Sequence, residues 1–288
     1  MKGDHKKLQM RDGVSLHLKI KEVGSPIWIV ASHGIGEHYG RHKYISKLFG
    51  QDFNICQYDL RGHGRSEGVG AYVDSFEHFY EDLGEIISYL EDKYKMKRMI
   101  LFGHSMGALI TSGYLQNEAH KHLYPEVVFL NAPPVGMPGA LGDVINIIPK
   151  SVFRNLVKLP LTIKLGGLVD LNYLSHNIQV KEEYLNDERN HLKLHSKLLL
   201  ELVKASKDVY ARPLRVECKA YCTYGSEDRV VGPAAIKNYF THTEKSFRLK
   251  EFEGAYHEIH NEIEKYRSVY FKFLKESFYE TLYTEFEA

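Results

Sequence analysis

The chain has 288 residues, of which 43% are hydrophobic and 26% are charged, and this composition is ordinary for a globular protein with one large core. The formal net charge of +1 gives no reason to expect a nucleic-acid partner, and no stretch approaches the about 18 consecutive apolar residues of a membrane span. Three cysteines in a chain of this size indicate a reducing compartment, so we expect a cytoplasmic protein.

The amino-terminal part of the chain predicts strands that alternate with helices. Its basic start, Met1–Lys7, is followed by no apolar segment, so we expect no signal peptide. The dipeptide Asp12-Gly13 predicts a hairpin between strands at Leu8–Met10 and Val14–Val23. The further predicted elements are strand Ile27–Ala31, helix His42–Phe49, strand Phe53–Tyr58, helix Ser75–Lys93, strand Met99–Phe102 and strand Val127–Leu130. This alternation favours an α/β fold with a mostly parallel sheet and helices on both faces.

One turn joins an apolar strand to an apolar helix through the sequence Gly103-His104-Ser105-Met106-Gly107. A nucleophilic serine requires a tight strand-to-helix turn that lifts its Oγ clear of the backbone, and glycines leave space for that turn. The five-residue pattern alone is weak, because any glycine-rich turn that contains a serine can match it. The strand before it and the helix after it are the context of a nucleophile elbow, so we predict that Ser105 is a nucleophile.

Two loops after Ser105 hold the candidate acid and base, in the order that the hydrolase triad requires. Each candidate follows a predicted strand, Asp228 after Val216–Tyr224 and His257 after Phe247–Phe252. Strand ends of this kind build the sites of α/β proteins, so we predict Asp228 as the acid and His257 as the base. Two neighbours stay open as alternatives, Glu227 for the acid and His260 for the base.

A second turn predicts the backbone donors of an oxyanion hole. The sequence His33-Gly34 follows the predicted strand Ile27–Ala31, and in this fold such a turn supplies one N–H group. The other comes from the residue after the nucleophile, so we predict the N–H groups of Ile35 and Met106. The helix that begins after the elbow adds the positive end of its dipole.

Between about Pro134 and Pro213 the alternation of strands and helices stops, and several Gly and Pro breaks occur. We therefore expect a core formed by residues 1–134 and 214–288, with a helical cap inserted at 135–213. A predicted first cap helix carries Val152, Phe153, Leu156 and Val157 on one face and Lys150, Arg154 and Lys158 on another. Two interpretations stay open, namely packing on the cap's own core, or a basic amphipathic element that makes peripheral contact with a lipid surface.

Other features of the cap and of the cysteines lead to narrower predictions. Residues Tyr184–Lys207 predict one polar helix with an apolar stripe, and the aliphatic stretch Val144–Leu168 predicts the walls of an acyl tunnel. Cys218 and Cys222 lie on one predicted strand, where a disulfide is badly placed, so packed free thiols are expected. The sequence has no cysteine or histidine cluster with zinc spacing, so we expect neither a metal nor another cofactor.

Five sequence blocks occur in one order between about residues 28 and 262: His33–His38 with Arg41, Tyr58–Glu67, Gly103–Gly107, Gly225–Val230 and His257–His260. Together they resemble the monoacylglycerol lipase and lysophospholipase branch of the α/β-hydrolases. The Gly-x-Ser-x-Gly block is shared by all serine α/β-hydrolases, whereas the block at His33–His38 with Arg41 is more particular to this branch. The segment from Gly136 to Val180 shows no such match.

The resemblance implies an α/β-hydrolase fold and a serine hydrolase of carboxylic esters that releases a fatty acid through an acyl-enzyme. The partner implied is a small lipid ester, with no cofactor, and the oligomeric state stays open. The roles it implies are nucleophile Ser105, acid Asp228, base His257, and backbone donors Ile35 and Met106. It also implies a buried, mutually bonded network of Glu37, Arg41 and His260 beside the site, with His33 as further support.

Three alternatives to the lipase remain. A proline-type serine aminopeptidase would hold a free amine with cap carboxylates, for which the candidates are Glu182, Glu183, Asp187 and Glu188. A carboxylesterase for small esters would use the same triad without a long acyl tunnel. A hydrolase fold kept as a non-catalytic binding module is disfavoured, because no member of the triad is missing here.

Overall fold

The computed structural model describes residues 3–121, 123–138, 148–156, 158, 162–167 and 169–283. Within these ranges eight strands form one sheet in the order β1-β2-β4-β3-β5-β6-β9-β10. Their bounds are β1 (Asp4–Gln9), β2 (Ser15–Lys21), β3 (Ile27–Ser32), β4 (Asn54–Tyr58), β5 (Arg98–His104), β6 (Val127–Asn131), β9 (Lys219–Gly225) and β10 (Phe247–Phe252). The β1–β2 and β2–β4 pairs are antiparallel, and all other pairs in the sheet are parallel.

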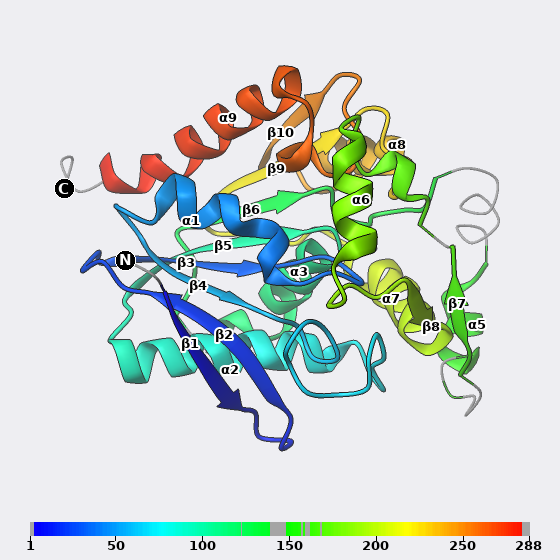
Figure 1. Cartoon of the computed structure of the whole chain (residues 1–288), viewed down its shortest axis with the longest axis horizontal. Coiled ribbons are helices and arrows are strands. Elements are labelled where there is room, and N and C mark those ends of the chain that lie inside the picture. The colour runs from blue at the N-terminus through cyan, green and yellow to red at the C-terminus, as the bar shows by residue number, and fades with distance from the viewer. Residues whose placement is uncertain are drawn as a thin grey trace.

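Helices cover both faces of this sheet, as Figure 1 shows. On one face lie α1 (Lys43–Phe49) and α9 (Glu264–Tyr283), and on the other lie α2 (Glu77–Tyr94) and α3 (Met106–Asn117). Strand β3 supplies both layers, because its side chains alternate: Ile27, Ile29 and Ala31 pack on the α1 and α9 side, and Trp28 and Val30 pack on the α2 and α3 side. The predicted α/β fold, with a mostly parallel sheet between two helical layers, is confirmed.

Shorter elements complete the description of the core. Helix α8 (Pro233–Asn238) lies between β9 and β10, and it is followed by a π-helical turn at Tyr239–Thr243. Single 3-10 turns occur at Tyr39–His42, Ala119–Lys121, Leu171–Tyr173 and Ile259–Asn261. Strand β1 begins four residues before the predicted strand Leu8–Met10, and most of its side chains are exposed. The hydrophobic pattern therefore missed its first half, which is held by backbone pairing with β2.

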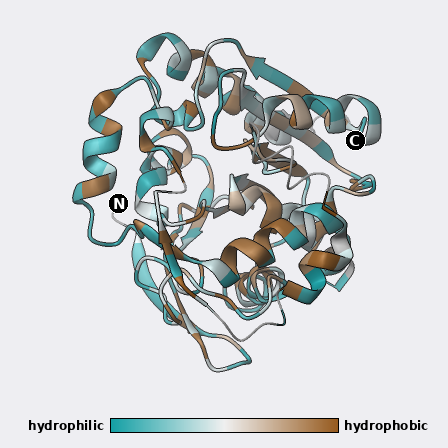
Figure 2. Ribbon diagram, turned by 90° about the vertical axis from the view of Figure 1, so that its right-hand side faces the viewer, coloured by the Kyte–Doolittle hydropathy of each residue, from teal (hydrophilic) through white to brown (hydrophobic). Residues whose placement is uncertain are grey.

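We call residues 135–213 the cap segment, and the described ones among them lie beside the carboxyl ends of the parallel strands (Figure 1). Their described helices are α5 (Lys150–Leu156), α6 (Ile178–Asn186) and α7 (Ser196–Val209). Two short antiparallel strands, β7 (Lys164–Gly166) and β8 (Lys193–His195), pair with each other. Figure 2 views the molecule from the right-hand side of Figure 1, and both apolar and polar residues occur along the helices seen there.

The single helix predicted over Tyr184–Lys207 is wrong, because α6 ends at Asn186 and α7 begins only at Ser196. The break has a local cause in side chains that satisfy backbone groups outside a helix. The Asp187 carboxylate accepts the N–H of Arg189 at 3.1 Å, and the Asn190 side-chain amide donates to the carbonyl of Tyr184 at 2.9 Å. Such side-chain bonds compete with helical hydrogen bonds, so the chain turns there.

On α5 the predicted apolar face is divided. Phe153 is buried, with the ammonium of Lys207 lying 5.6 Å from its ring centre, whereas Val152 and Leu156 remain 40% and 36% exposed. Val157 lies outside the described residues. The three cysteines are free, as expected. Among the described helices, none has both the length and the apolar content that a bilayer crossing requires.

Candidate active site

Ser105 stands at the sharp turn between β5 and α3, in a backbone conformation that L-residues rarely adopt. Its φ is 51° and its ψ is −119°. The turn is held by hydrogen bonds on both sides, because the Ser105 N–H donates to the carbonyl of Asn131 on β6 at 2.8 Å and the Ser105 carbonyl accepts the N–H of Ala108 at 2.8 Å. A strained residue that its surroundings fix in this way is typical of a functional site.

The two glycines of the elbow are required by close packing. A Cβ atom at Gly103 would overlap the carbonyl oxygen of Gly107, and a Cβ atom at Gly107 would overlap the carbonyl oxygen of Ser32 on β3. Strand and helix can therefore approach each other only if both positions lack a side chain. This confirms the tight strand-to-helix turn that the Gly-x-Ser-x-Gly pattern predicts.

Asp228 and His257 form a buried pair from the loops after β9 and β10. The Nδ1 of His257 donates to Oδ2 of Asp228 at 2.6 Å, and the other carboxylate oxygen accepts the N–H groups of Val230 at 2.7 Å and Val231 at 3.0 Å. Glu227, the open alternative for the acid, is exposed. The structure thus brings Asp228 rather than Glu227 against the histidine.

The surroundings of His257 stabilise its protonated form. Burial lowers the pKa of the imidazole, but the charge and the hydrogen bond of Asp228 outweigh burial, so the pKa lies above its ordinary value. The carboxylates of Glu258 and Glu37 act in the same direction. A histidine that gains a proton readily, on a ring oriented by a carboxylate, suits a general base that is protonated during a reaction.

The two residues predicted to donate to an oxyanion belong to the turn after β3 and to the start of α3. Ile35 lines the same cavity as Ser105 and His257. The turn that leads to Ile35 is held by Glu37, because the N–H of Gly34 donates to the Glu37 carboxylate at 2.5 Å. Met106 is the first residue of α3, where a backbone N–H has no acceptor within the helix.

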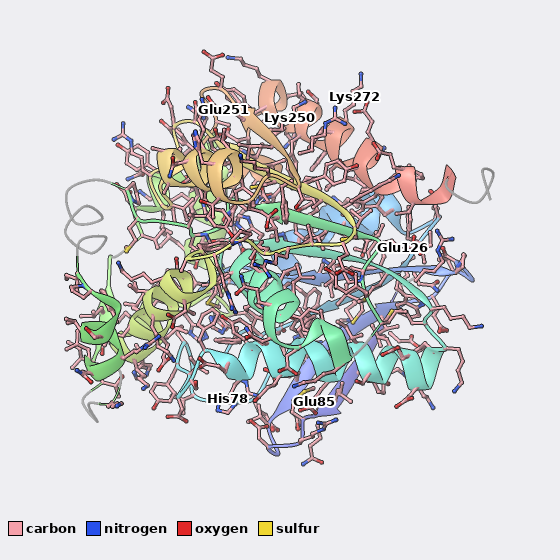
Figure 3. The ribbon with its side chains drawn as sticks, turned by 180° about the vertical axis from the view of Figure 1, so that it is seen from behind. His78, Glu85, Glu126, Lys250, Glu251 and Lys272 are labelled. Atoms are coloured by element: carbon pink, nitrogen blue, oxygen red, sulfur yellow. The ribbon has the colours of Figure 1, made fainter. Side chains whose placement is uncertain are left out.

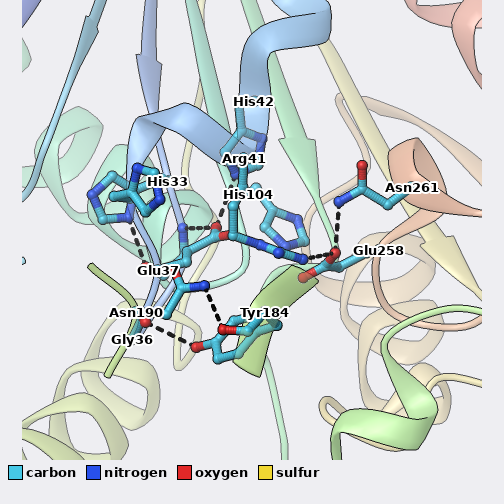
Figure 4. Close-up of polar contacts among 12 residues, drawn as sticks. His33, Gly36, Glu37, Arg41, His42, His104, Tyr184, Asn190, Glu258 and Asn261 are labelled. Carbon is cyan, nitrogen blue, oxygen red and sulfur yellow. Dashed lines mark hydrogen bonds and ion pairs between the residues drawn. The ribbon is translucent and has the colours of Figure 1, made fainter. Parts of the chain in front are cut away.

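Residues of the cap segment hold the other end of the same turn. The carbonyl of Gly36, a residue with a φ of 70°, accepts the Tyr184 hydroxyl at 2.8 Å and the N–H of His191 at 2.7 Å. Figure 4 shows the tyrosine reaching Gly36 from α6. On the sheet side, the Nδ1 of His33 bonds to the Gly34 carbonyl at 2.8 Å, and its Nε2 accepts the N–H of Leu60 at 3.0 Å. His33 therefore shapes the turn.

A buried charged network adjoins this turn (Figure 4). The Arg41 guanidinium donates to Glu37 at 3.1 Å and to Glu258 at 2.5 Å, and the second oxygen of Glu37 bonds to Nε2 of His42 at 2.8 Å. Burial alone would raise the pKa of Glu37, but His42, His104 and Arg41 outweigh it and hold that pKa well below the ordinary value. Burial would lower the pKa of Arg41, but Glu258 and Glu37 raise it. Both charges are retained.

His260 does not take the place predicted for it in this network. Its two ring nitrogens have no hydrogen-bond partner among the described residues, so the predicted bonds to Glu37 and Arg41 are wrong. Its ring instead packs against the rings of His42, Tyr44 and His104, with centroids 4.7, 4.9 and 4.9 Å away. Burial, with the neighbouring imidazoles, lowers the pKa of His260 well below its ordinary value, which keeps the ring neutral.

The polar positions expected of His260 are filled by His42 and Glu258, which the sequence analysis did not single out. Both stood close to predicted residues, since His42 follows Arg41 directly and Glu258 follows His257. Their position next to predicted site residues was the available signal. Burial of a charged residue without a partner is costly, and that cost could have suggested pairing with Arg41.

A cavity of about 440 Å³ connects these groups. Its polar lining consists of Glu37, His104, Ser105, Asp170, Lys181, Tyr184, His191, His257 and Glu258. Its aliphatic lining consists of Ile35, Leu165, Val169, Leu171, Leu174, Leu185, Leu192, Leu194 and Val230. The aliphatic stretch Val144–Leu168, predicted to wall a tunnel, supplies Leu165 and Gly167 among the described residues, while Val144 and Leu168 lie outside them. Most of the apolar lining comes instead from residues 169–194.

Within the part of the chain that the structure describes, no group of three or more His, Cys, Asp or Glu side chains is arranged to hold a metal ion. The groups that the structure brings together at the cavity are a serine and a histidine–carboxylate pair. Hydroxyl attack on a carbonyl carbon is the reaction that such groups perform together.

Comparison with known proteins identifies relatives of the chain. It is 26% identical over 240 residues to a monoacylglycerol lipase of Mycolicibacterium smegmatis, an alignment that covers 82% of this chain and 83% of the relative. It is 28% identical over 251 residues to the monoglyceride lipase of Homo sapiens, covering 84% and 79%. It also matches an uncharacterized abhydrolase domain-containing protein of Dictyostelium discoideum at 25% identity, but spans only 25% of that much longer protein.

Solved structures share the fold. A monoacylglycerol lipase of Paleococcus ferrophilus superposes with a TM-score of 0.78 at 24% identity, covering 91% of this chain and 97% of that one. A soluble variant of the monoglyceride lipase of Saccharomyces cerevisiae, in complex with a substrate analog, also gives 0.78, at 18% identity and 96% and 94% coverage.

A family model described as serine aminopeptidase, S33, matches residues 27–264, which is most of the chain. The family match and the sequence relatives together support an ester hydrolase. The chain belongs to this hydrolase family and, within it, to the monoacylglycerol-lipase-like branch of the α/β-hydrolases.

Proposed function

We propose that this protein is a serine hydrolase that cleaves the ester bond of monoacylglycerols and releases a free fatty acid. The observation that carries the proposal is one cavity that combines the candidate catalytic groups with many aliphatic side chains. Ser105 on its strained elbow and His257 line it together with nine aliphatic residues. An ester of a fatty acid with a small polyol likewise combines a polar part with a long aliphatic part. Sequence relatives named as monoacylglycerol lipases support the proposal.

In the proposed mechanism the Ser105 hydroxyl attacks the ester carbonyl carbon while His257 accepts its proton. Asp228 holds the imidazole in the required tautomer and stabilises the imidazolium that forms. The tetrahedral oxyanion accepts hydrogen bonds from the N–H groups of Ile35 and Met106. His257 then protonates the leaving alcohol, and a water molecule deprotonated by the same histidine attacks the acyl-enzyme and releases the fatty acid.

The aliphatic lining favours a long acyl chain over a short one. Burial of each methylene group contributes about 0.8 kcal/mol, so a chain that fills the cavity gains affinity with each added carbon. Leu185 on α6, Leu192 just before β8 and Leu194 within β8 contribute to this lining. This lining distinguishes the proposed lipase from a carboxylesterase for small esters.

The charges around the cavity favour an uncharged head group. Glu37, Glu258 and Asp170 carry three negative charges, whereas Lys181 and Arg41 carry two positive charges, and Arg41 binds both Glu37 and Glu258. The phosphate of a lysophospholipid would face this excess of negative charge at low exposure to solvent, where it is weakly screened. The hydroxyl groups of glycerol can instead donate hydrogen bonds to the same carboxylates. We therefore place monoacylglycerols before lysophospholipids as substrates.

The proline-type aminopeptidase is a weaker candidate because of where the cap carboxylates lie. Glu183, Asp187 and Glu188 line a separate crevice, together with Lys43 and Lys47 of α1, rather than the cavity that holds Ser105. A free amine bound to them would be separated from Ser105 by the Arg41 network. This separation does not favour recognition of an amino terminus beside the proposed nucleophile.

We also propose that residues 135–213 form a cap on a core made of residues 1–134 and 214–288, and that the cap meets a lipid surface peripherally. The exposed aliphatic residues of the cap support this contact: Val152 (40%), Leu156 (36%), Ile163 (62%), Ile178 (75%), Leu185 (45%) and Leu192 (51%). Two of them, Leu185 and Leu192, also line the cavity. Contiguous apolar surface that is exposed often marks a membrane contact. A cytoplasmic location stays a prediction.

A substrate panel tests the proposed function. The purified protein and its Ser105→Ala variant should be assayed on monoacylglycerols, on lysophospholipids and on prolyl amides. We expect the highest kcat/KM on long-chain monoacylglycerols, with the activity lost in the variant. Highest activity on prolyl amides would replace the lipase by the aminopeptidase, and highest activity on lysophospholipids would overturn the argument from the charges.

A further inference from the structure

The loop that carries His257 is bonded to the cap segment. The N–H of His257 donates to the carbonyl of Tyr173 at 3.4 Å, and the N–H of Glu258 donates to the carbonyl of Leu174 at 2.8 Å. These two N–H groups stand on either side of the His257 Cα atom. The position of the imidazole therefore depends on the cap chain at residues 173–174, and not on the strand β10 alone.

Glu262 joins the same two segments through a buried carboxylate. The residue is fully buried, and its Oε1 accepts the N–H of Tyr256 at 3.0 Å and the Nδ1–H of His176 at 2.8 Å. Its Oε2 accepts the N–H groups of His176 at 3.2 Å and Ile263 at 2.9 Å. Tyr256 directly precedes His257, and His176 belongs to the cap segment. One carboxylate thus binds both sides of the junction.

Ring contacts extend this junction to the loop of Asp228. The His176 ring stacks on the Tyr256 ring, with centroids 3.8 Å apart and planes at 20°. The ring of Tyr173 packs against that of Tyr256 at 5.4 Å. The Tyr173 hydroxyl accepts a hydrogen bond from the Arg229 guanidinium at 2.8 Å, and this guanidinium lies 4.2 Å from the centre of the Tyr173 ring. Arg229 follows Asp228, so one short piece of the cap contacts the loops of both members of the His257–Asp228 pair.

We propose that Glu262 is a positioning residue for His257, and that it couples docking of the cap segment to alignment of the base. By binding His176 and the N–H of Tyr256 at once, it fixes the imidazole in register with Asp228 and Ser105. The hydrogen bond between His257 and Asp228 is short, and misplacement of a catalytic group by about 1 Å can cost on the order of 100-fold in rate. The inference rests on the proposed function, since it takes His257 to be the base.

Substitution of Glu262 by glutamine tests this role. The variant Glu262→Gln keeps the size of the side chain, but its amide nitrogen cannot accept hydrogen bonds, so one pair of donors loses its acceptor. We expect kcat to fall by about 100-fold while KM changes by less than about threefold, because the substrate contacts remain. The low-field proton resonance of the His257–Asp228 hydrogen bond should shift or broaden at a temperature well below the melting transition.

A second pair of variants keeps the proposal testable if Glu262→Gln folds poorly. His176→Ala removes the ring but leaves Glu262 its three backbone donors, and the His176 side chain is 31% exposed, so the fold should persist. We expect a loss of about tenfold in kcat. His176→Asn should restore most of the loss, because its amide nitrogen can donate to Glu262 as Nδ1 does.

His78→Ala is the matched control. His78 also donates from Nδ1 to a glutamate, Glu81, at 3.0 Å, but it lies on the outer side of α2, as Figure 3 shows. We expect wild-type kcat from this variant. A Glu262→Gln protein with wild-type kcat and an unchanged resonance would overturn the inference, as would wild-type kcat in His176→Ala. If Ser105→Ala retained activity, the proposed function itself would fail, and that result is distinct from the other two.

Discussion

The two halves of the cap segment meet the rest of the molecule in different ways. The inner half, residues 169–191, is hydrogen-bonded to three loops of the candidate site. Tyr173 and Leu174 bond to the His257 loop, the Tyr173 hydroxyl accepts a bond from Arg229 in the Asp228 loop, and Tyr184 and His191 bond to the turn at Gly36. The outer half, whose described residues are 148–156, 158 and 162–167, carries Val152, Leu156 and Ile163 at the surface. Its Arg154 pairs with Asp208 of α7 at 3.4 Å, away from those loops.

This difference suggests a division of labour within one insertion. The inner half has a small apolar cluster of its own, built on Leu174, Val180 and Tyr184, and its polar atoms fix the geometry of the site. The outer half contributes little to that geometry and exposes aliphatic surface instead. Changes in the inner half should therefore alter the rate of the chemical step, and changes in the outer half should alter contact with lipid.

The largest expected effect concerns Ser105, which belongs to neither half of the cap segment. Ser105→Ala should reduce kcat by a factor on the order of 10⁶, as loss of the nucleophile does in other serine hydrolases. The loss should be the same whether or not the outer half carries further substitutions. Steady-state kinetics on a soluble ester measures it. Near-complete activity in the variant would show that another residue performs the attack.

Arg41 lies under the inner half, with its guanidinium carbon 4.8 Å from the centre of the Tyr184 ring. Arg41→Met leaves Glu37 and Glu258 buried without their shared cation, which should lower the free energy of unfolding by about 3–5 kcal/mol. Arg154→Met in the outer half removes an exposed ion pair and should cost less than about 1 kcal/mol. Denaturant unfolding of the two variants makes the comparison, and equal stabilities would remove the distinction between the halves.

The pH dependence tests the environment of His257. Its pKa lies above the ordinary value in the folded protein, and the base must be neutral to accept a proton. The value of kcat/KM should therefore be low in acid, rise about tenfold per pH unit, and reach half its maximum above about pH 6.5. Because Glu258 helps to raise this pKa, Glu258→Gln should move the midpoint to lower pH. A profile that stays flat from about pH 5 to 8 would argue against a histidine base.

Tyr184→Phe tests the role of the inner half by removing one hydroxyl group. The carbonyl of Gly36 would lose the hydroxyl of Tyr184 but keep the N–H of His191. One hydrogen bond contributes about 1 kcal/mol, so kcat on a soluble ester should fall about fivefold. Tyr72→Phe, which removes an exposed hydroxyl bonded to Asp74, is the matched control and should leave kcat unchanged.

For the outer half we expect the opposite result, namely an unchanged kcat and weaker binding to lipid. The double variant Val152→Ser with Leu156→Ser should keep wild-type kcat on a soluble ester and bind lipid vesicles more weakly. Vesicle sedimentation measures the second property. A fall in kcat without a change in vesicle binding would assign to the outer half the role that we give to the inner half.

The smallest expected effect is a step in affinity for each carbon of the acyl chain. Each buried methylene can improve binding by up to about fourfold, so kcat/KM on monoacylglycerols of increasing length should rise and then level off when the cavity is filled. Triacylglycerols should be poor substrates, because an enclosed site admits one chain. Rates that are highest on acetate esters and decline with acyl-chain length would contradict the proposal that the substrate is a lipid ester.

The core and the cap differ in how far the sequence predicts them. Strand alternation, the elbow glycines and the loops of Asp228 and His257 depend on local patterns, so their positions could be predicted to within a few residues. The cap has short elements whose ends depend on the hydrogen bonds of single side chains. The break at Asn186 depends on side-chain bonds of Asp187 and Asn190, and no periodicity marks it.

The candidate site shows the same limit. The predicted pairing of Asp228 with His257 needed only the order of the loops along the chain. The partners of Arg41 depend on a contact between residues 217 positions apart, Arg41 and Glu258, which spacing does not reveal. His260 was assigned a hydrogen-bonding role from resemblance, and the neighbouring rings leave its nitrogens without partners. Glu262 stood in the same loop and gave no sign of its bonds to the cap.

The central claim is that Ser105 becomes acylated, and covalent labelling tests it most directly. The protein should be treated with a fluorophosphonate that carries a long alkyl chain, and the adduct should be located by peptide mass spectrometry. We predict one adduct, on Ser105, with loss of monoacylglycerol hydrolysis in proportion to labelling. An adduct on a different serine, or full hydrolytic activity in protein fully labelled at Ser105, would contradict the account.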